Sequence, residues 1–195
     1  MKNKIHIHLD PIGGISGDMF IAAMIDAETK LKKIAIETAK LILKESKLDI
    51  RKAKQNHIQG TSLYVNVKDI NKQHHRSLKD IVKLIKNCKV NKNTKILSIK
   101  MFTQLAKAEA KIHGSNINEV KFHEVGAWDS IIDNVISARI IEYLEDKYDL
   151  SWSCSEIPMG KGVINSQHGI IPVPAPATSL LLKDLNIIDD GIIGE

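Results

Sequence analysis

The sequence predicts an α/β or α+β fold in which helices pack on a small mixed sheet, with the topology of the sheet left open. Three observations predict it. Apolar residues recur with the helical period in some segments and alternate with the strand period in others. The predicted strands and helices interleave along the chain instead of forming separate runs. The 195 residues, 43% of them hydrophobic, are enough for one substantial domain.

The N-terminal elements are two strands or hairpins around two helices. Residues 5–10 alternate between apolar and polar side chains, as a half-buried strand does. Ser16 is then placed to cap a helix, and a second helix is expected over residues 30–47. Residues 57–69 are typical of a strand or hairpin with one apolar face.

The middle of the chain is predicted to be mainly helical. A polar linker over residues 71–76 precedes Ser77, which is placed to cap a helix over 78–88. A longer helix over 92–113 is expected to stop at Gly114, a residue suited to the position just after a helix.

The C-terminal part begins with a short strand over 120–124 and a helix over 129–144, indicated by its apolar spacing. Glycine and proline then become frequent over 151–195, where we expect strands, a hairpin, an extended proline segment and a helix over 177–183. We interpret residues 1–195 as a single domain with a proline- and glycine-rich subregion.

Charge and composition restrict the class of protein. The formal net charge of +5 and the pI of about 9.1 favour anionic partners. Aromatic residues make up only 4% of the chain, too few for a platform that stacks bases, so nucleic acid is not expected as a partner. Cys88 and Cys154 form no CxxC pair, which argues against a disulfide scaffold. No apolar stretch is long enough to span a bilayer, and we expect a cytoplasmic protein.

The first candidate site is the glycine-rich turn between the first strand and the first helix. Backbone amides near Gly14, Ser16 and Gly17 can approach an oxyanion at the helix N-terminus. Asp10 and Asp18 are placed to hold a divalent cation that neutralises phosphate. The alternative is a tight turn in which Ser16 caps the helix and Asp18 complements its dipole.

The second candidate site consists of imidazole and carboxylate side chains from two helices and their connection: Glu109, His113, His123, Glu124, Asp129 and Asp133. Glu109 and His113 share one helix face, and so do Asp129 and Asp133. Such a mixed set suits a hard cation or a borderline metal such as nickel or zinc. The alternative is two polar helix faces with acidic residues near a helix start.

Other histidines are weaker candidates. His74 and His75 lie in the polar linker, where they are placed to bind nickel, although a solvated loop is the alternative. His6 and His8 share one face of the first strand, a pattern more typical of a surface than of metal ligands.

A fourth segment combines glycines with prolines around Lys161 and His168, two residues that can bind anionic groups. Glycine freedom and the fixed φ of proline predict a rigid, sharply shaped loop system there. From the residues alone this segment is no more than an ordered binding loop.

Five motifs follow one another along the chain: LDPxxGISGDMF at 9–20, AEAKIHG at 108–114, FHEVGAxDSIxD at 122–133, PMGxG at 158–162 and HGIxPVPAPAT at 168–178. Together they resemble the LarC family, the nickel insertion proteins of nickel-pincer cofactor biosynthesis. Members of that family often have a long histidine-rich run where this chain has only His74 and His75. They also usually have another histidine at the position of Lys121.

The resemblance implies a CTP-dependent cyclometallase, a lyase-type nickel chelatase. Its substrate would be pyridinium-3,5-bisthiocarboxylic acid mononucleotide, into which nickel(II) is inserted. CTP would act with manganese or magnesium. The family's C-terminal domain, which is associated with nucleotide binding, is absent from this chain, so a separate C-terminal half is an expected partner. Whether the chain forms a homo-oligomer is left open.

Two functional hypotheses follow from this resemblance. In the first, the glycine-rich turn, together with Lys161 and His168, binds the anionic substrate. His123, Glu124 and Asp129 act in catalysis, and the metal ligands come from His74, His75, His113, His123, Glu124 and Asp133. In the second, the chain is a non-catalytic subunit that binds metal or nucleotide and needs a C-terminal partner for turnover.

Overall fold

The structure is a computed structural model that describes residues 2–55, 57–67, 76–122, 125–166 and 169–194. The chain divides into two compact units, each made of separate stretches. One unit comprises Met1–Ile15, Thr103–Val120 and Lys147–Glu195, and the other comprises Ser16–Phe102 and Lys121–Asp146. The boundary falls inside helix α4 (Lys92–His113).

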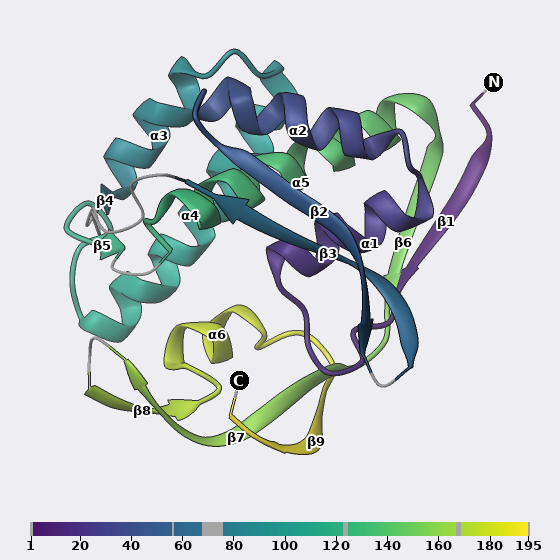
Figure 1. Cartoon of the computed structure of the whole chain (residues 1–195). Helices are drawn as coiled ribbons and strands as arrows, with labels where there is room; N and C mark the ends of the chain where they lie inside the picture. The colour runs from purple at the N-terminus through teal and green to yellow at the C-terminus, as the bar shows by residue number, and fades with distance from the viewer. Residues whose placement is uncertain (1, 56, 68–75, 123–124, 167–168, 195) are drawn as a thin grey trace. The chain divides into compact units, whose positions relative to one another are not determined.

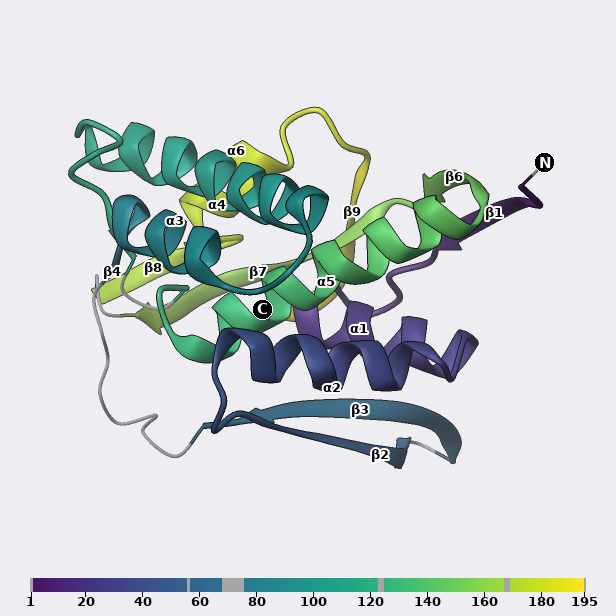
Figure 2. The ribbon, with the colours of Figure 1, turned by 90° about the horizontal axis from the view of Figure 1, so that it is seen from above.

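In the second unit, helices α1 (Gly17–Ala27) and α2 (Leu31–Ile42) pack against an antiparallel hairpin (Figure 2). The hairpin consists of β2 (Lys47–Gln55) and β3 (Ile58–Asn66). On β3, the buried Leu63 is part of the face that was expected to be apolar. This packing holds the start of α1 in a defined place.

The rest of the second unit is built around α5 (Trp128–Lys147), which is buried on most of its faces. Its fully buried side chains form the largest part of the core: Ile131, Ile132, Val135, Ile136, Ala138 and Ile140. Helix α3 (Leu78–Asn87) begins at a capping box, because Ser77 and Asp80 each accept a backbone hydrogen bond from the other.

The first unit contains two small sheets (Figure 1). In one, β1 and β6 run parallel, with Lys4 opposite Asp149. In the other, β7 lies between β8, which is antiparallel to it, and β9, which is parallel to it. The bounds of the elements in this unit are Lys4–Leu9 (β1), Asp149–Cys154 (β6), Ile157–Ser166 (β7), Gly169–Val173 (β8), Pro176–Leu181 (α6) and Ile187–Ile193 (β9).

Two glycines shape the pairing of β7 with β9. A Cβ on Gly160 would collide with the carbonyl oxygen of Gly194, so the two backbones approach too closely for any side chain at this position. Gly162 instead has a φ of 104°, in the left-handed region that favours glycine. The register between the strands shifts between Met159 and Lys161.

The expected mixed α/β architecture is confirmed, and the described strands fall into four small sheets. The predicted helix over 30–47 is wrong at its end, since α2 stops at Ile42 and β2 begins at Lys47. The cap expected from the side chain of Ser16 is also wrong. Its hydroxyl donates to the Asp18 carboxylate and makes no hydrogen bond to the backbone of α1.

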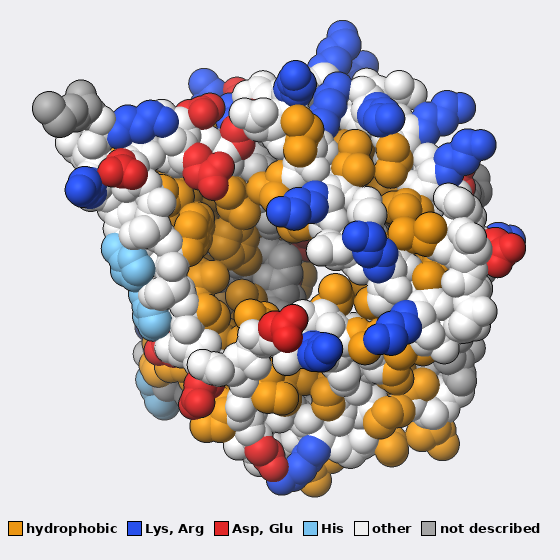
Figure 3. All heavy atoms as spheres, turned by 180° about the vertical axis from the view of Figure 1, so that it is seen from behind, with side chains coloured by type: hydrophobic (Ala, Val, Ile, Leu, Met, Phe, Trp, Pro, Cys, Tyr) orange, Lys and Arg blue, Asp and Glu red, His pale blue; other side chains and the backbone are white. Residues whose placement is uncertain are grey.

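Cys88 is buried, Cys154 is exposed, and both are free thiols. Among the described residues, no helix combines the length and the apolar character needed to cross a membrane. Figure 3 shows Lys and Arg side chains spread over one face, with apolar side chains and some acidic ones among them. On that face the basic residues do not merge into the continuous stripe typical of a nucleic-acid-binding surface.

Candidate functional site

The starts of α1 and α5 meet where two of the sequence motifs come together. A Cβ built on Gly17 would lie only 3.0 Å from the Cβ of Asp133 and 3.5 Å from its Oδ2. Only a residue without a side chain permits this approach without movement of the neighbour. Gly17 therefore lets the start of α1 lie against Asp133, the last residue of the FHEVGAxDSIxD motif.

Asp133 is the most perturbed acid of this site. Burial, and then the negative charges of Asp18 and Asp129, raise the pKa of its carboxyl group to about 7. Its Oδ1 is buried and has no hydrogen-bond partner among the described residues. An acid of this kind is partly protonated at neutral pH, and one of its oxygens lacks a hydrogen-bond partner among the described residues.

Asp18 and Asp129 lie in the first turns of their helices, where the helix dipole favours negative charge. Asp18 accepts the hydroxyl hydrogen bond of Ser16. Asp129 accepts a hydrogen bond of 2.8 Å from the backbone nitrogen of Ser130. The structure thus brings Ser16, Gly17, Asp18, Asp129 and Asp133 together, and we call these five residues the acidic cluster.

Three carboxylates so close together repel one another, and a proton or a cation relieves that repulsion. Within the part of the chain that is described, no three or more His, Cys, Asp or Glu side chains are arranged to hold a metal ion. A cation at the acidic cluster would therefore need ligands from the substrate, from water or from other residues.

The short strands β4 (Arg76–Ser77) and β5 (Lys121–Phe122) link two further candidate segments. They pair antiparallel, with Arg76 opposite Phe122. The Arg76 guanidinium donates to the carbonyl oxygen of Gly126 and lies 4.4 Å from the centre of the Trp128 ring. Partial burial lowers the pKa of Arg76.

Arg76 and Trp128 are residues that sequence reasoning missed. Arg76 fixes the backbone just before α5, because it binds Gly126 and stacks on Trp128 at the same time. Gly126 is also required there, since a Cβ on it would lie 2.7 Å from the carbonyl oxygen of Phe122. The only signal in the sequence was an arginine directly after two histidines.

Other predicted site residues belong to the first unit. Asp10 is exposed after β1, and Gly14 has a φ of 109° in the turn that follows. Lys161 forms an exposed ion pair of 3.2 Å with Asp189. His113 lies 3.5 Å from Glu109 on the same face of α4, as the spacing predicted. Five predicted site residues lie outside the described residues: His74, His75, His123, Glu124 and His168.

Comparisons with known proteins agree on one family. The family model described as nickel insertion protein matches residues 7–195. A pyridinium-3,5-bisthiocarboxylic acid mononucleotide nickel insertion protein of Staphylococcus epidermidis is 41% identical over 181 residues, which cover 93% of this chain and 45% of the relative. Proteins with the same name from Akkermansia muciniphila and Desulfitobacterium hafniense are 39% and 38% identical and cover 95% and 96% of the chain, respectively.

The chain spans about half the length of the curated relatives that it matches: these alignments cover 47% of the Akkermansia protein and 46% of the Desulfitobacterium protein. No solved structure matches the chain.

Proposed function

Because this chain belongs to the nickel insertion protein family, we propose that it takes part in inserting nickel(II) into pyridinium-3,5-bisthiocarboxylic acid mononucleotide. The observation that carries this proposal is the family match over residues 7–195, together with relatives named for that substrate. Nickel is the cargo of this reaction and the mononucleotide is its organic substrate. The product would be the nickel-pincer cofactor.

The acidic cluster supports a role at the reacting end of the substrate. The ring carbon between the two thiocarboxylates carries a hydrogen, and a bond from nickel to that carbon requires its loss as a proton. A general base works best when its pKa lies near the working pH. Asp133, with a pKa of about 7 and an unpaired Oδ1, suits the transfer of that proton to a carboxylate oxygen.

The glycine-rich turn supports a role in binding the phosphate of the mononucleotide. The N-terminus of α1 offers backbone amides and a favourable dipole, while Asp18 places a negative charge in the same turn. A divalent cation would offset the repulsion between that carboxylate and a phosphate. We therefore keep Ser16, Gly17 and Asp18, at the start of α1, as proposed substrate-binding residues, with Asp129 next to them.

The pairing of β4 with β5 supports a shared role for the two histidine-containing segments. His75 precedes Arg76 in the chain and His123 follows Phe122, and the two described neighbours are paired across the strands. We propose that nickel is held by imidazoles from both segments, with Glu124 as a further ligand.

Replacing His123 with alanine is expected to weaken nickel binding at least tenfold, and His75→Ala is expected to act on the same site. Imidazole is a preferred ligand of nickel, and removal of one ligand from a small set weakens binding strongly. Isothermal titration with nickel chloride measures the effect. His57→Ala, which changes a histidine in the exposed turn of the β2–β3 hairpin, serves as the control. Unchanged stoichiometry and affinity in His123→Ala would remove that residue from the site.

A second candidate function is that of a subunit that binds metal or nucleotide and needs a C-terminal partner for CTP-dependent turnover. The relatives from Staphylococcus epidermidis and Akkermansia muciniphila are about twice as long as the regions that align with this chain. The first unit also exposes large apolar side chains on β7, β8, β9 and the segment around α6: Val163, Ile170, Leu181, Leu185, Ile187, Ile188, Ile192 and Ile193. Exposed apolar surface of this extent favours a partner.

An insertion assay separates the two functions. The purified chain is incubated with nickel, the mononucleotide, CTP and either magnesium or manganese, with and without the C-terminal half of a relative. The subunit hypothesis expects turnover only in the complete mixture, because it assigns the use of CTP to the C-terminal partner. Turnover by the isolated chain would reject the subunit hypothesis, and turnover without CTP would remove the nucleotide from the proposal.

A further inference from the structure

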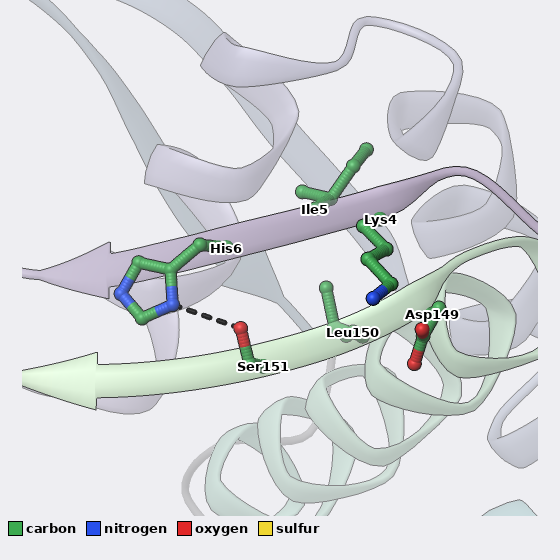
Figure 4. Close-up of a pocket in the computed structure, with 6 residues that line it drawn as sticks. All are labelled: Lys4, Ile5, His6, Asp149, Leu150 and Ser151. Carbon is green, nitrogen blue, oxygen red and sulfur yellow. Dashed lines mark hydrogen bonds between the residues drawn. The ribbon is translucent and has the colours of Figure 1, made fainter.

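The parallel sheet of β1 and β6 carries a row of histidines and serines on one face. Side chains alternate along both strands, so His6 and His8 on β1 share a face with Ser151 and Ser153 on β6. Figure 4 shows His6 pointing across the sheet to Ser151, at the edge of a shallow pocket lined by both strands. The opposite face carries apolar residues such as Ile7 and Trp152.

All four ring nitrogens of these two histidines are engaged by serine hydroxyls. His6 Nδ1 lies 2.9 Å from Ser151 Oγ, and His6 Nε2 lies 2.8 Å from Ser153 Oγ. His8 Nδ1 lies 2.7 Å from Ser153 Oγ, and His8 Nε2 lies 3.0 Å from Ser155 Oγ. The two rings are therefore held in the same orientation relative to the strands.

The decisive feature is that two imidazole nitrogens from different residues converge on one atom. His6 Nε2 and His8 Nδ1 both contact Ser153 Oγ, at 2.8 and 2.7 Å. When the Ser153 side chain rotates away, a metal ion near the position that its oxygen leaves has both nitrogens directed at it. Imidazole nitrogens bind zinc-like ions at about 2.0–2.1 Å, so small rotations of the two rings close the remaining gap.

The ligand chemistry selects the class of ion. Two neutral imidazoles favour the borderline divalent metals nickel, copper and zinc over magnesium, calcium and manganese, which prefer oxygen. Two protein ligands leave most coordination positions to water. Such a site binds weakly and releases its ion readily, which suits the handover of an ion more than its permanent retention.

Stability does not account for the arrangement. The side chains of His6, His8 and Ser153 are exposed, so their hydrogen bonds compete with water and contribute little to folding. Parallel strands also tend to carry apolar residues on both faces, whereas this face is polar throughout. Folding stability therefore does not require these histidines and serines, and they can instead bind a ligand.

We propose that His6 and His8 form a surface site for a borderline divalent metal ion, centred near Ser153 Oγ. Its role as a collecting point for nickel rests on the proposed function of the chain, but its ability to bind the ion does not. Because the proposed site has two protein ligands, a single substitution at residue 6 or residue 8 removes half of them.

Nickel chloride titrated into the ¹⁵N-labelled full chain tests the site. Paramagnetic nickel is expected to broaden the amide signals of Ser151 and Ser153 at substoichiometric amounts. His6→Gln and His8→Gln, which keep a polar side chain at each position, should each require at least tenfold more nickel for the same broadening. Ser153→Ala should keep the response within about threefold, because the imidazoles remain. His57→Ala is the control for an unrelated exposed histidine.

Equal broadening of Ser151 and Ser153 in the wild type, His6→Gln and His8→Gln would overturn the site, and so would loss of the response in Ser153→Ala alone. Dispersed amide spectra verify that each variant is folded. An insertion assay on the same samples separates this proposal from the proposed function. Absence of insertion by the wild type with its C-terminal partner would defeat the proposed function, whereas broadening lost in the histidine variants would still establish the metal site.

Discussion

Asp133→Asn is expected to raise the free energy of unfolding by about 2 kcal/mol at pH 8 and, under the proposed function, to lower nickel insertion at least 100-fold in the assay with a C-terminal half. In the native protein, burial and two neighbouring carboxylates raise the pKa of Asp133 from 3.8 to about 7. By linkage this corresponds to at most about 4 kcal/mol, and relaxation around the charge reduces it. The amide has no charge to bury, while loss of a general base costs about 10²–10⁴ in rate.

The pH dependence identifies the cause of this gain. At pH values well below 3.8, the ordinary pKa of the carboxyl group, it is protonated in both the folded and the unfolded chain, so the variant should have no advantage. The advantage should grow between about pH 3 and about pH 7, as the unfolded chain releases a proton that the native state retains, and should then level off. Urea denaturation from about pH 2.5 to pH 8 measures it. Asp146→Asn, an exposed position at the end of the same helix, is the control, and a full gain already present at about pH 2.5 would contradict this account.

Arg139→Met is expected to lower the free energy of unfolding by about 3 kcal/mol. The carboxylate of Glu142 is only 6% exposed and is held by the hydroxyl of Thr94, which donates to Oε2, and by Arg139 Nη1 at 3.3 Å from the same oxygen. Removing the guanidinium leaves a buried negative charge without its counterion, a change that typically costs 3–5 kcal/mol.

A combined substitution separates an unpaired charge from lost packing. Replacing Glu142 with leucine and Thr94 with valine in the Arg139→Met background removes the charge and the hydroxyl together, so most of the stability should return. Lys33→Met, which breaks an exposed pair of 3.8 Å with Glu37, should change stability by less than about 0.5 kcal/mol. A triple variant as unstable as Arg139→Met would assign the loss to packing around Arg139 instead.

The elements with strong local signals could be predicted from the sequence. The capping box at Ser77, the end of α4 before Gly114 and the apolar repeat of α5 depend on residues within a few positions of one another. The strand β2 was not predicted from the sequence. Apolar and polar residues alternate only weakly over its lysine-rich residues 47–55, and no glycine or proline separates it from the preceding helix. Its pairing with β3 decides its structure, and that pairing is not a local property.

The candidate site was predictable in its residues but not in its arrangement. The motifs identified Gly17 and Asp133, yet their contact depends on how α1 and α5 pack, across more than one hundred residues of chain. The perturbed pKa of Asp133 has the same origin, since burial and Asp18 are both tertiary features. From the sequence, His6 and His8 were interpreted as ordinary surface residues. The serines that contact them lie on β6, which pairs with β1 in space but is about 145 residues away along the chain.

Gly160 and Gly162 in β7 are required for different reasons: Gly160 for lack of space and Gly162 for its backbone conformation. At Gly160 the backbone of Gly194 leaves no room for a side chain of either configuration. At Gly162 the nearest atom to an added Cβ is a side-chain carbon of Ile193 at 3.4 Å, and the obstacle is the φ of 104°. A residue of D configuration would occupy that conformation comfortably, so semisynthesis with D-alanine can tell a chirality requirement from a volume requirement within one short motif.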